Sequence, residues 1–274
     1  MPRIIYPSQQ FALQQKIARK SVMEFQPKIK AALQADFDKA ADLVKELGVS
    51  QVINFNRSFF NKDSVSNVLK TLYETTGGYT AAKYQKIFDG FKKSETINFL
   101  GLEIDDVWVA FMLSYWYAIS GQKMWGIENT TDKEIEKILA YAFLYGRENN
   151  LSINEVNAMA IQLLREGKIN VSRSLLIART ETHQALSTGA MGSAMKINIP
   201  LLKQWVHAEY VGKPRVWHQA LDTQTDPDKS GARLEVNQPF LVTSPNGTVE
   251  MQYAHDANGG AINNCNCRCC TVYV

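Results

Sequence analysis

The feature that most constrains this chain is a change of pattern near Pro200. Before it, apolar residues recur at spacings of three and four over long stretches, which is the spacing of one helix face. After it, these stripes vanish, and Gly, Pro, Asn and Asp punctuate short apolar runs, which favours strands and turns. The pattern predicts an α+β fold, in which a helix-rich N-terminal region is followed by a helical segment with a small C-terminal antiparallel β subdomain.

Two helices are expected near the start of the chain. Residues 28–47 carry a one-sided apolar stripe that stops at Gly48, and glycine commonly ends a helix. Residues 11–25 are also helix-like. Because proline lacks a backbone N–H, Pro27 predicts that the two helices meet there as separate elements.

Three further helices are expected in the middle of the chain. Thr131 with Glu134, and Ser152 with Glu155, each form an S/T-x-x-E capping box, which marks a helix start. A third helix is expected over residues 172–186, ending before a run of small residues that contains two glycines.

The C-terminal part is expected to contain a hairpin and a final strand. Asn246 and Gly247 form a turn dipeptide between the apolar runs 240–243 and 248–251, which predicts a β-hairpin. The β-branched and aromatic residues of 270–274 predict a closing strand.

We expect the chain to divide after residue 130. The first part, 1–130, is expected to be a helical N-terminal region. The second, 131–274, is expected to be a C-terminal domain whose helices extend to about residue 190 and whose strands lie in 200–274.

The balance of charge argues against a dedicated nucleic-acid binder with a long basic stripe. The net charge is only +3, but residues 1–100 hold 15 Lys and Arg against 9 Asp and Glu, whereas residues 101–150 hold 4 against 8. The basic excess of the N-terminal helices permits nonspecific DNA contact, with a solvated helix face as the alternative.

No window is long and apolar enough for a membrane span, and the first residues show no export signal.

Histidine and cysteine are confined to the last third of the sequence. The four cysteines are Cys265, Cys267, Cys269 and Cys270. Disulfides are disfavoured because adjacent and alternate thiols do not bridge easily. Redox chemistry is a further explanation of the thiols. The two interpretations that we carry forward are a structural zinc site, for which His218 and His255 would supply further ligands, and small buried apolar groups on a strand and its lead-in.

Two other polar patterns have more than one interpretation. One is an acid/base site formed by Arg215, His218 and Asp222, but no nucleophile elbow accompanies these residues, so no catalytic residue is predicted. The alternative function that remains is a metal-dependent hydrolase or nuclease that uses the His/Cys cluster. Residues 226–231 resemble half of a calcium loop but lack its final glutamate, which favours a polar turn.

Arg179 and His183 lie one turn apart on the third of the expected middle helices. They are interpreted as a polar clamp onto the β subdomain or as a solvated face.

Several of these pieces occur together in an order that resembles a known family. The pieces are, in order, Leu176-Ile177-Ala178-Arg179-Thr180-Glu181, Trp205, Arg215-x-x-His218-x-x-Leu221-Asp222, Phe240 and Asn266-Cys267-Arg268-Cys269. Together they resemble the head morphogenesis domain of the phage Mu F-like minor head proteins, and the resemblance covers about residues 131–274. The residues to which the resemblance assigns a structural, noncatalytic role are Arg179, Thr180, Glu181, Arg215, His218, Asp222, Asn266 and Arg268.

The resemblance implies a non-enzymatic minor capsid protein of a tailed phage or prophage. Such a protein would belong to the virion, in the head interior or at the portal vertex, after assembly in the host cytoplasm. Its N-terminal region would contact the portal protein, the major capsid protein or the scaffold, and it would act in head assembly and in DNA packaging or ejection.

The chain departs from the family pattern where many members carry C-x-x-C. Here residues 223–226 hold no thiol. A zinc ion would therefore have to use ligands among His218, His255, Cys265, Cys267, Cys269 and Cys270.

Overall fold

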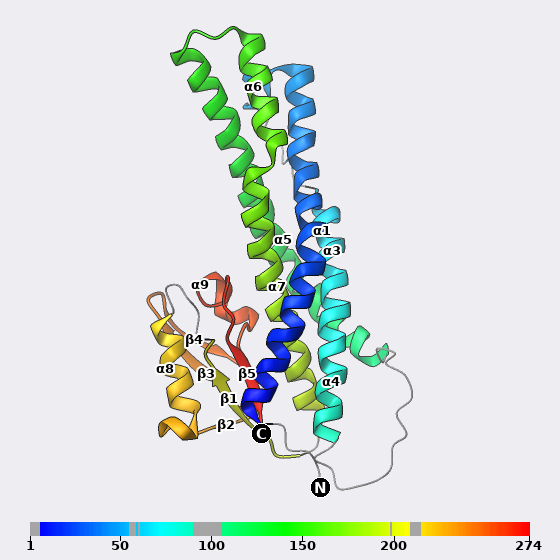
Figure 1. Cartoon of the computed structure of the whole chain (residues 1–274), viewed down its shortest axis with the longest axis vertical. Helices are drawn as coiled ribbons and strands as arrows, with labels where there is room; N and C mark the ends of the chain where they lie inside the picture. Colours follow the sequence, from blue (N-terminus) through cyan, green and yellow to red (C-terminus); the bar gives the residue numbers. More distant parts are fainter. Residues whose placement is uncertain (1–5, 55–58, 60, 90–105, 198, 209–214) are drawn as a thin grey trace. The chain divides into compact units, whose positions relative to one another are not determined.

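Helices form most of the described chain up to Lys196, and strands with short helices form the rest (Figure 1). The structure is a computed structural model that describes residues 6–54, 59, 61–89, 106–197, 199–208 and 215–274. The helices of the first part are α1 (Pro7–Leu47), α2 (Val49–Val52), α3 (Lys62–Leu72), the π-helical turn η1 (Tyr73–Gly77), α4 (Gly78–Asp89), α5 (Asp106–Glu148), α6 (Ile153–Glu166) and α7 (Lys168–Lys196).

The second part contains the strands. Its elements are β1 (Leu202–Val206), α8 (Val216–Thr225), the 3-10 turn η2 (Pro227–Lys229), β2 (Leu234–Glu235), β3 (Phe240–Ser244), β4 (Gly247–Met251), the 3-10 turn η3 (Ala257–Gly259), α9 (Gly260–Asn264) and β5 (Cys270–Tyr273). The predicted α+β class, with helices first and a small antiparallel β part last, is confirmed. The hairpin β3–β4 and the final strand β5 also lie where the sequence predicts them.

The chain forms two compact units that do not follow the boundary expected after residue 130. Unit 1 comprises Met1–Glu24, Lys70–Tyr117 and Leu176–Val274, and unit 2 comprises Phe25–Leu69 and Ala118–Leu175. Residue 130 lies inside α5. Local sequence patterns group residues that are close along the chain, whereas here segments from both ends build unit 1.

Unit 2 is held by the apolar face predicted for residues 28–47. Phe37, Ala40 and Val44 of α1 are buried there against Ile135 and Leu139 of α5. Burial of such side chains contributes about 1.5–3 kcal/mol each for the larger ones, which stabilises the helix pairing. Gly48 ends α1 as predicted, with a φ of 81°.

Unit 1 contains a small three-stranded sheet and the β3–β4 hairpin. The sheet has the order β2-β1-β5, and both pairings are antiparallel. Trp205 of β1 and Phe240 of β3 meet edge to face, with ring centroids 5.4 Å apart, so that sheet and hairpin share one apolar cluster.

Glutamine side chains of α1 line the free edge of β5. Gln10 accepts a hydrogen bond from the Tyr273 N–H at 3.0 Å and donates to the Tyr273 carbonyl. Gln14 donates to the Thr271 carbonyl at 2.9 Å. Because an edge strand leaves backbone groups unpaired, these side chains take the place of a neighbouring strand.

The break expected at Pro27 is wrong, since α1 continues through it from Pro7 to Leu47. Proline inside a helix costs about 3 kcal/mol. Buried residues on both sides, such as Ile17 before it and Ile29 after it, offset that cost.

One of the two expected capping boxes is confirmed. The Ser152 hydroxyl oxygen accepts a hydrogen bond from the Glu155 N–H at the start of α6, and the Glu155 carboxylate accepts one from the Ser152 N–H. The helix start expected at Thr131 is wrong, because Thr131 lies inside α5. Its hydroxyl donates to the Ile127 carbonyl one turn earlier, at 2.8 Å, and so does not cap.

The helix end expected before the two glycines is also wrong, because α7 runs through them to Lys196. Gly189 lies against η1: a Cβ built on it would stand 2.3 Å from the Gly77 carbonyl oxygen. These small residues therefore permit close contact between helical segments and do not break the helix.

The described helices include none that combines the length and apolar character needed to span a bilayer.

Candidate metal centre

Three donor atoms from two segments of unit 1 meet at one buried point. His218 lies on α8, and Cys267 and Cys269 lie in the turn between α9 and β5. The His218 Nδ1 is 3.5 Å from the Cys267 Sγ and 3.6 Å from the Cys269 Sγ. The side chains are exposed by only 1%, 4% and 3% in that order. This His/Cys group could hold a metal ion.

The separations fit a small tetrahedral ion. With a Zn–S bond of about 2.3 Å and a Zn–N bond of about 2.05 Å, a tetrahedral angle puts nitrogen and sulfur about 3.6 Å apart. The two nitrogen–sulfur distances match this value, so the donors need little rearrangement to bind such an ion.

The orientation of His218 is set by its neighbours. Its Nε2 is 3.4 Å from the Asn263 Oδ1, which also accepts a hydrogen bond from the Trp217 Nε1 at 2.8 Å. The Trp205 ring meets the imidazole at 5.0 Å between centroids. Donation from Nε2–H to Asn263 leaves the Nδ1 lone pair facing the sulfurs, which is the usual arrangement of a metal-binding histidine.

The turn that carries the thiols is shaped by backbone hydrogen bonds. Asn266 has a φ of 54°, in the left-handed region that asparagine tolerates better than most residues. Its N–H donates to the Thr180 Oγ1 on α7 at 3.1 Å. The Cys269 N–H donates to the Cys267 Sγ at 3.4 Å, which holds the two sulfurs on one side of the turn.

Arg215 fastens the segment that precedes this turn. Its guanidinium donates to the carbonyl oxygens of Ile262 and Cys265, each at 2.7 Å. Arg215 directly precedes α8, so this contact joins the helix that carries His218 to the segment that leads to the thiols.

The two thiols differ in acidity. A hydrogen bond from Cys269 lowers the pKa of Cys267 well below its usual value, with further lowering from His255 and His218 against the opposing effect of burial. The same hydrogen bond and burial raise the pKa of Cys269 well above its usual value. The pair therefore favours one thiolate and one thiol, and a bound cation would displace the remaining proton.

A second pair of imidazoles lies beside this group. His183 of α7 and His255 stack with centroids 5.2 Å apart and planes inclined by 14°. Burial, followed by the neighbouring His255, lowers the pKa of His183 to about 3, so its ring is neutral at physiological pH. Of the two alternatives for the Arg179/His183 face, the clamp describes His183, because its ring is buried.

Of the six candidate ligands, His255, Cys265 and Cys270 fall outside the described His/Cys group. Cys265 is half-buried. The Cys270 Sγ accepts a hydrogen bond from Gln15 at 3.5 Å, and burial raises the pKa of Cys270 to about 12. Cys270 thus behaves as the buried apolar group that was the alternative interpretation of the thiols.

Glu181 and Arg268 have different environments within unit 1. Glu181 is buried and accepts a hydrogen bond from the Tyr73 hydroxyl at 2.8 Å. Arg268, which stands between Cys267 and Cys269 in the sequence, is half-buried. Arg179 is half-buried on α7.

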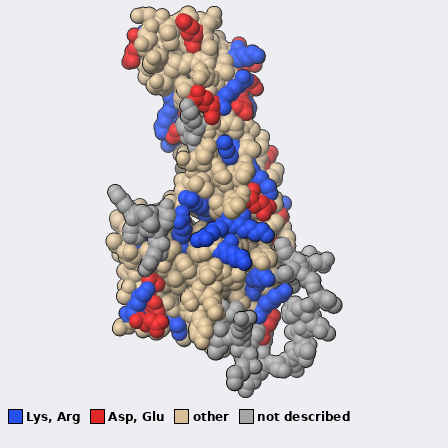
Figure 2. All heavy atoms as spheres, in the orientation of Figure 1, with Lys and Arg blue, Asp and Glu red and all other residues tan. Residues whose placement is uncertain are grey.

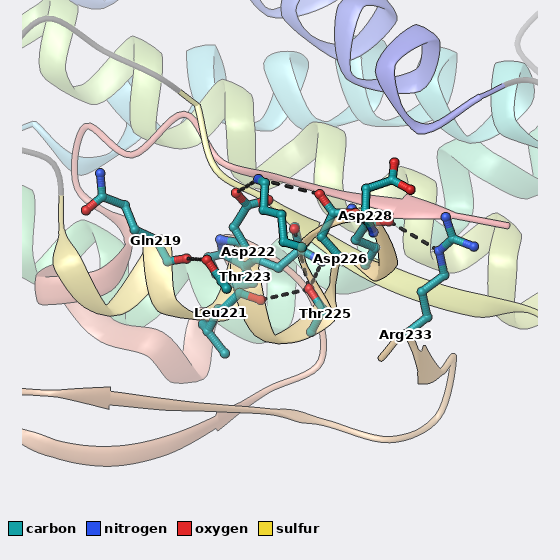
Figure 3. Close-up of polar contacts among 11 residues, drawn as sticks. Gln219, Leu221, Asp222, Thr223, Thr225, Asp226, Asp228 and Arg233 are labelled. Atoms are coloured by element: carbon teal, nitrogen blue, oxygen red, sulfur yellow. Dashed lines mark hydrogen bonds and ion pairs between the residues drawn. The ribbon is translucent and has the colours of Figure 1, made fainter. Parts of the chain in front are cut away.

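Asp222 is not one of the donors of the described His/Cys group. Asp222 and Asp226 both turn toward the ammonium group of Lys229 (Figure 3), which lies 3.5 Å from the Asp226 carboxylate. The Asp226 carboxylate also caps η2 by accepting from the Asp228 N–H. Residues 226–231 form a polar turn, as the sequence favours.

Some contributors to the site carry no sequence signal. Asn263 orients His218 but belongs to no motif, and Trp205 matches the family pattern without an indication that it packs on His218. The asparagines around Cys265 do indicate a turn at this point, because asparagine favours turns and left-handed backbone, but they do not indicate a contact with His218.

Comparison of the chain with protein-family models, with curated proteins and with solved structures gives no match.

Proposed function

We propose that this chain is a non-enzymatic head morphogenesis protein, a minor capsid component of a tailed phage or prophage that acts in head assembly and in DNA packaging or ejection. The observation that carries the proposal is the ordered set of three motifs, I-A-R-T-E, R-x-x-H-x-x-L-D and N-C-R-C. Their contacts support it: Thr180 of the first binds the backbone of Asn266 in the third, and His218 of the second meets the thiols of the third. The motifs act together as the framework of one module.

Zinc is the metal that the His/Cys group fits best. Thiolates together with imidazole nitrogen are typical zinc donors, and the nitrogen–sulfur distances agree with tetrahedral zinc. A bound zinc ion would supply folding free energy by joining α8 to the terminal turn. Its role in this proposal is structural.

The partners proposed for residues 1–130 are the portal protein, the major capsid protein or the scaffold. The protein would reside in the head interior or at the portal vertex, after assembly in the host cytoplasm. Nonspecific DNA contact is proposed for the basic part of this region, because residues 1–100 hold 15 Lys and Arg against 9 Asp and Glu. Figure 2 shows Lys and Arg of the described chain as a group near the middle of the face in view. Because neutralised phosphates release counterions, such binding should weaken steeply as salt rises.

Mass spectrometry of purified virions and proheads tests the proposal. We expect peptides of this chain in both, at a copy number far below that of the major capsid protein. As a control for contamination, lysate from the same infection is cleared of particles and then carried through the same purification. Absence from virions and proheads alike would refute the proposal.

The enzymatic alternative, a metal-dependent hydrolase or nuclease, gains less support from the site. A three-donor centre would leave one coordination position for water, but all three donors are buried, which restricts access for a substrate. A hydrolytic activity lost in His218→Ala, with fold and metal content intact, would favour this alternative.

Metal content gives the first test of the zinc proposal. Protein purified without an affinity tag should carry about one zinc ion, and a strong chelator should lower its thermal stability because metal binding free energy contributes to folding. Cys265→Ser serves as the control, because its thiol lies outside the described group. Elemental analysis showing less than about a tenth of an equivalent would contradict the proposal.

A further inference from the structure

His255 is a buried imidazole whose polar atoms are unsatisfied. Its side chain is 1% exposed, and within the described part of the chain neither Nδ1 nor Nε2 makes a hydrogen bond of good geometry, although the Cys267 thiol is close enough to interact with the ring. A buried polar group without a partner costs about 1–3 kcal/mol. Its backbone also has a φ of 71°, in the left-handed region that residues other than glycine seldom adopt. Costs of this kind concentrate where a ligand is bound.

The surroundings of His255 hold its ring in place beside the thiols. The ring stacks on His183, which fixes its plane. The preceding Ala254 N–H donates to the Thr271 Oγ1 at 2.8 Å, so the segment is tied to β5 just after the thiol-bearing turn. The imidazole is a neighbour of the Cys267 thiol but lies outside the group of three donors that already meet, so it must shift toward them to bind the same ion.

We propose that His255 is the fourth ligand of the zinc site and completes a Cys2His2 set with His218, Cys267 and Cys269. The inference rests on the zinc part of the proposed function and goes beyond the three donors that already meet. Occupation of the fourth position by His255 leaves none for water, which makes the site structural and closed. It also gives the unsatisfied imidazole a partner.

Charge balance favours an imidazole over a third thiol as that ligand. A divalent cation with two thiolates and two neutral imidazoles has no net charge, whereas a third thiolate would leave a buried negative charge. Uncompensated charge in a buried site is costly. His255 therefore suits the fourth position better than the half-buried Cys265 does.

The proposed ion would join three parts of unit 1 that are separate in sequence. They are α8, the turn that follows β4, and the turn before β5. Such a crosslink would stabilise a small β part with few strands in the way that zinc stabilises other small modules.

Cobalt(II) substitution of the full-length chain tests the ligand assignment. We expect the unaltered protein to bind one Co2+ with the intense visible bands of tetrahedral coordination and with thiolate-to-cobalt charge transfer. In His255→Ala, we expect affinity for Co2+ and Zn2+ to fall by more than about 100-fold, because even the loss of a residue that only supports a ligand costs 10- to 100-fold. The tetrahedral bands should weaken. Unchanged affinity and bands in this variant would overturn the inference.

Three matched variants complete the experiment. Cys265→Ser should bind as the unaltered chain does, whereas a loss equal to that of His255→Ala would overturn the assignment in favour of Cys265. His183→Asn should retain the tetrahedral bands, and their loss there with retention in His255→Ala would assign the ligand to His183. His255→Gln keeps a polar side chain of similar size but supplies a poor zinc ligand, and its far-UV circular dichroism guards against a variant that fails to fold. It should lose tight binding as His255→Ala does, and tight binding by a folded His255→Gln would overturn the inference.

The failure of this inference is distinguishable from that of the proposed function. Absence of metal from the unaltered protein would refute the zinc proposal and the fourth ligand with it. Metal retained without His255 would leave a three-residue site. The presence of the chain in virions is measured independently of both.

Discussion

Lys203 places an ammonium group in the core of unit 1, where it is fully buried. Its Nζ donates to the Gln252 carbonyl at 2.7 Å and lies 4.8 Å from the centre of the Phe240 ring. Burial lowers the pKa of Lys203 to about 8, although the nearby Asp256 acts in the opposite direction. The carbonyl and the aromatic face thus compensate only part of the cost of dehydrating the charge.

This lysine should make stability rise with pH above about 8. Between the folded pKa of about 8 and the unfolded value of 10.5, the unfolded chain binds more protons than the folded chain, so the free energy of unfolding increases with pH. Between about pH 7.5 and about pH 9 the gain should be about 1 kcal/mol. Urea unfolding at both pH values measures it.

Lys203→Met is the control for this prediction, since it keeps the length of the side chain and removes the titrating group. The difference in unfolding free energy between the unaltered chain and Lys203→Met should shift by that amount across the same pH interval. A pH-independent difference would show that Lys203 does not titrate in this range.

At the residue scale, the sequence indicates which side chains carry metal chemistry but not which of them meet. His218, Cys267 and Cys269 are candidates by type and by crowding, yet their convergence depends on the contacts of Arg215 and Asn263 with other segments. Cys270 has the same type and neighbourhood in sequence as Cys269. However, β5 begins at Cys270, and the Cys270 side chain contacts Gln15 of α1.

At the element scale, the contact between α7 and η1 depends on the absence of a side chain. Gly189→Ala would place a methyl group 2.3 Å from a backbone oxygen, which cannot move independently of its helix. We expect a loss of about 1–3 kcal/mol in unfolding free energy, the range observed for overpacked cores. Denaturant unfolding measures the loss.

Gly121→Ala is the matched control, because Gly121 lies inside α5 and an added Cβ would meet nothing within 4 Å. Alanine is favoured over glycine in a helix by about 1 kcal/mol, so this variant should be neutral or slightly more stable. Equal destabilisation by both substitutions would contradict a specific role for Gly189.

The elements predicted correctly are those whose signals are local. The Asn246–Gly247 turn and the Ser152 capping box each satisfy their own backbone groups, so they form as the sequence predicts. Pro27 and Thr131 also carry local signals, but the predictions drawn from them are wrong because neither residue lies at a helix end. In these cases the long helices are stabilised by burial on both sides of the signal, which short-range patterns do not reveal.

At the scale of the whole molecule, α1 and β5 lie far apart in the sequence and are joined in unit 1. Gln10→Ala with Gln14→Ala would leave backbone groups of Tyr273 and Thr271 without partners, at a cost of about 1–3 kcal/mol for each unsatisfied group. We expect faster amide hydrogen exchange in β5, read by mass spectrometry.

Gln9→Ala gives the control for this edge, because Gln9 lies on the same helix and is exposed. Its substitution should leave exchange in β5 unchanged. If β5 were equally protected in the double variant, the glutamine side chains would not stabilise that edge.

This contact between α1 and β5 has a consequence for the order in which the two units fold during synthesis. All segments of unit 2 have been translated once residue 175 is added, but unit 1 still lacks β5, which is translated later. Domains generally fold as units as their sequence emerges. The first turns of α1 are translated long before β5 and cannot complete their contacts with it until it has emerged, so a nascent chain released before β5 is made would have a complete unit 2 and an unfinished unit 1.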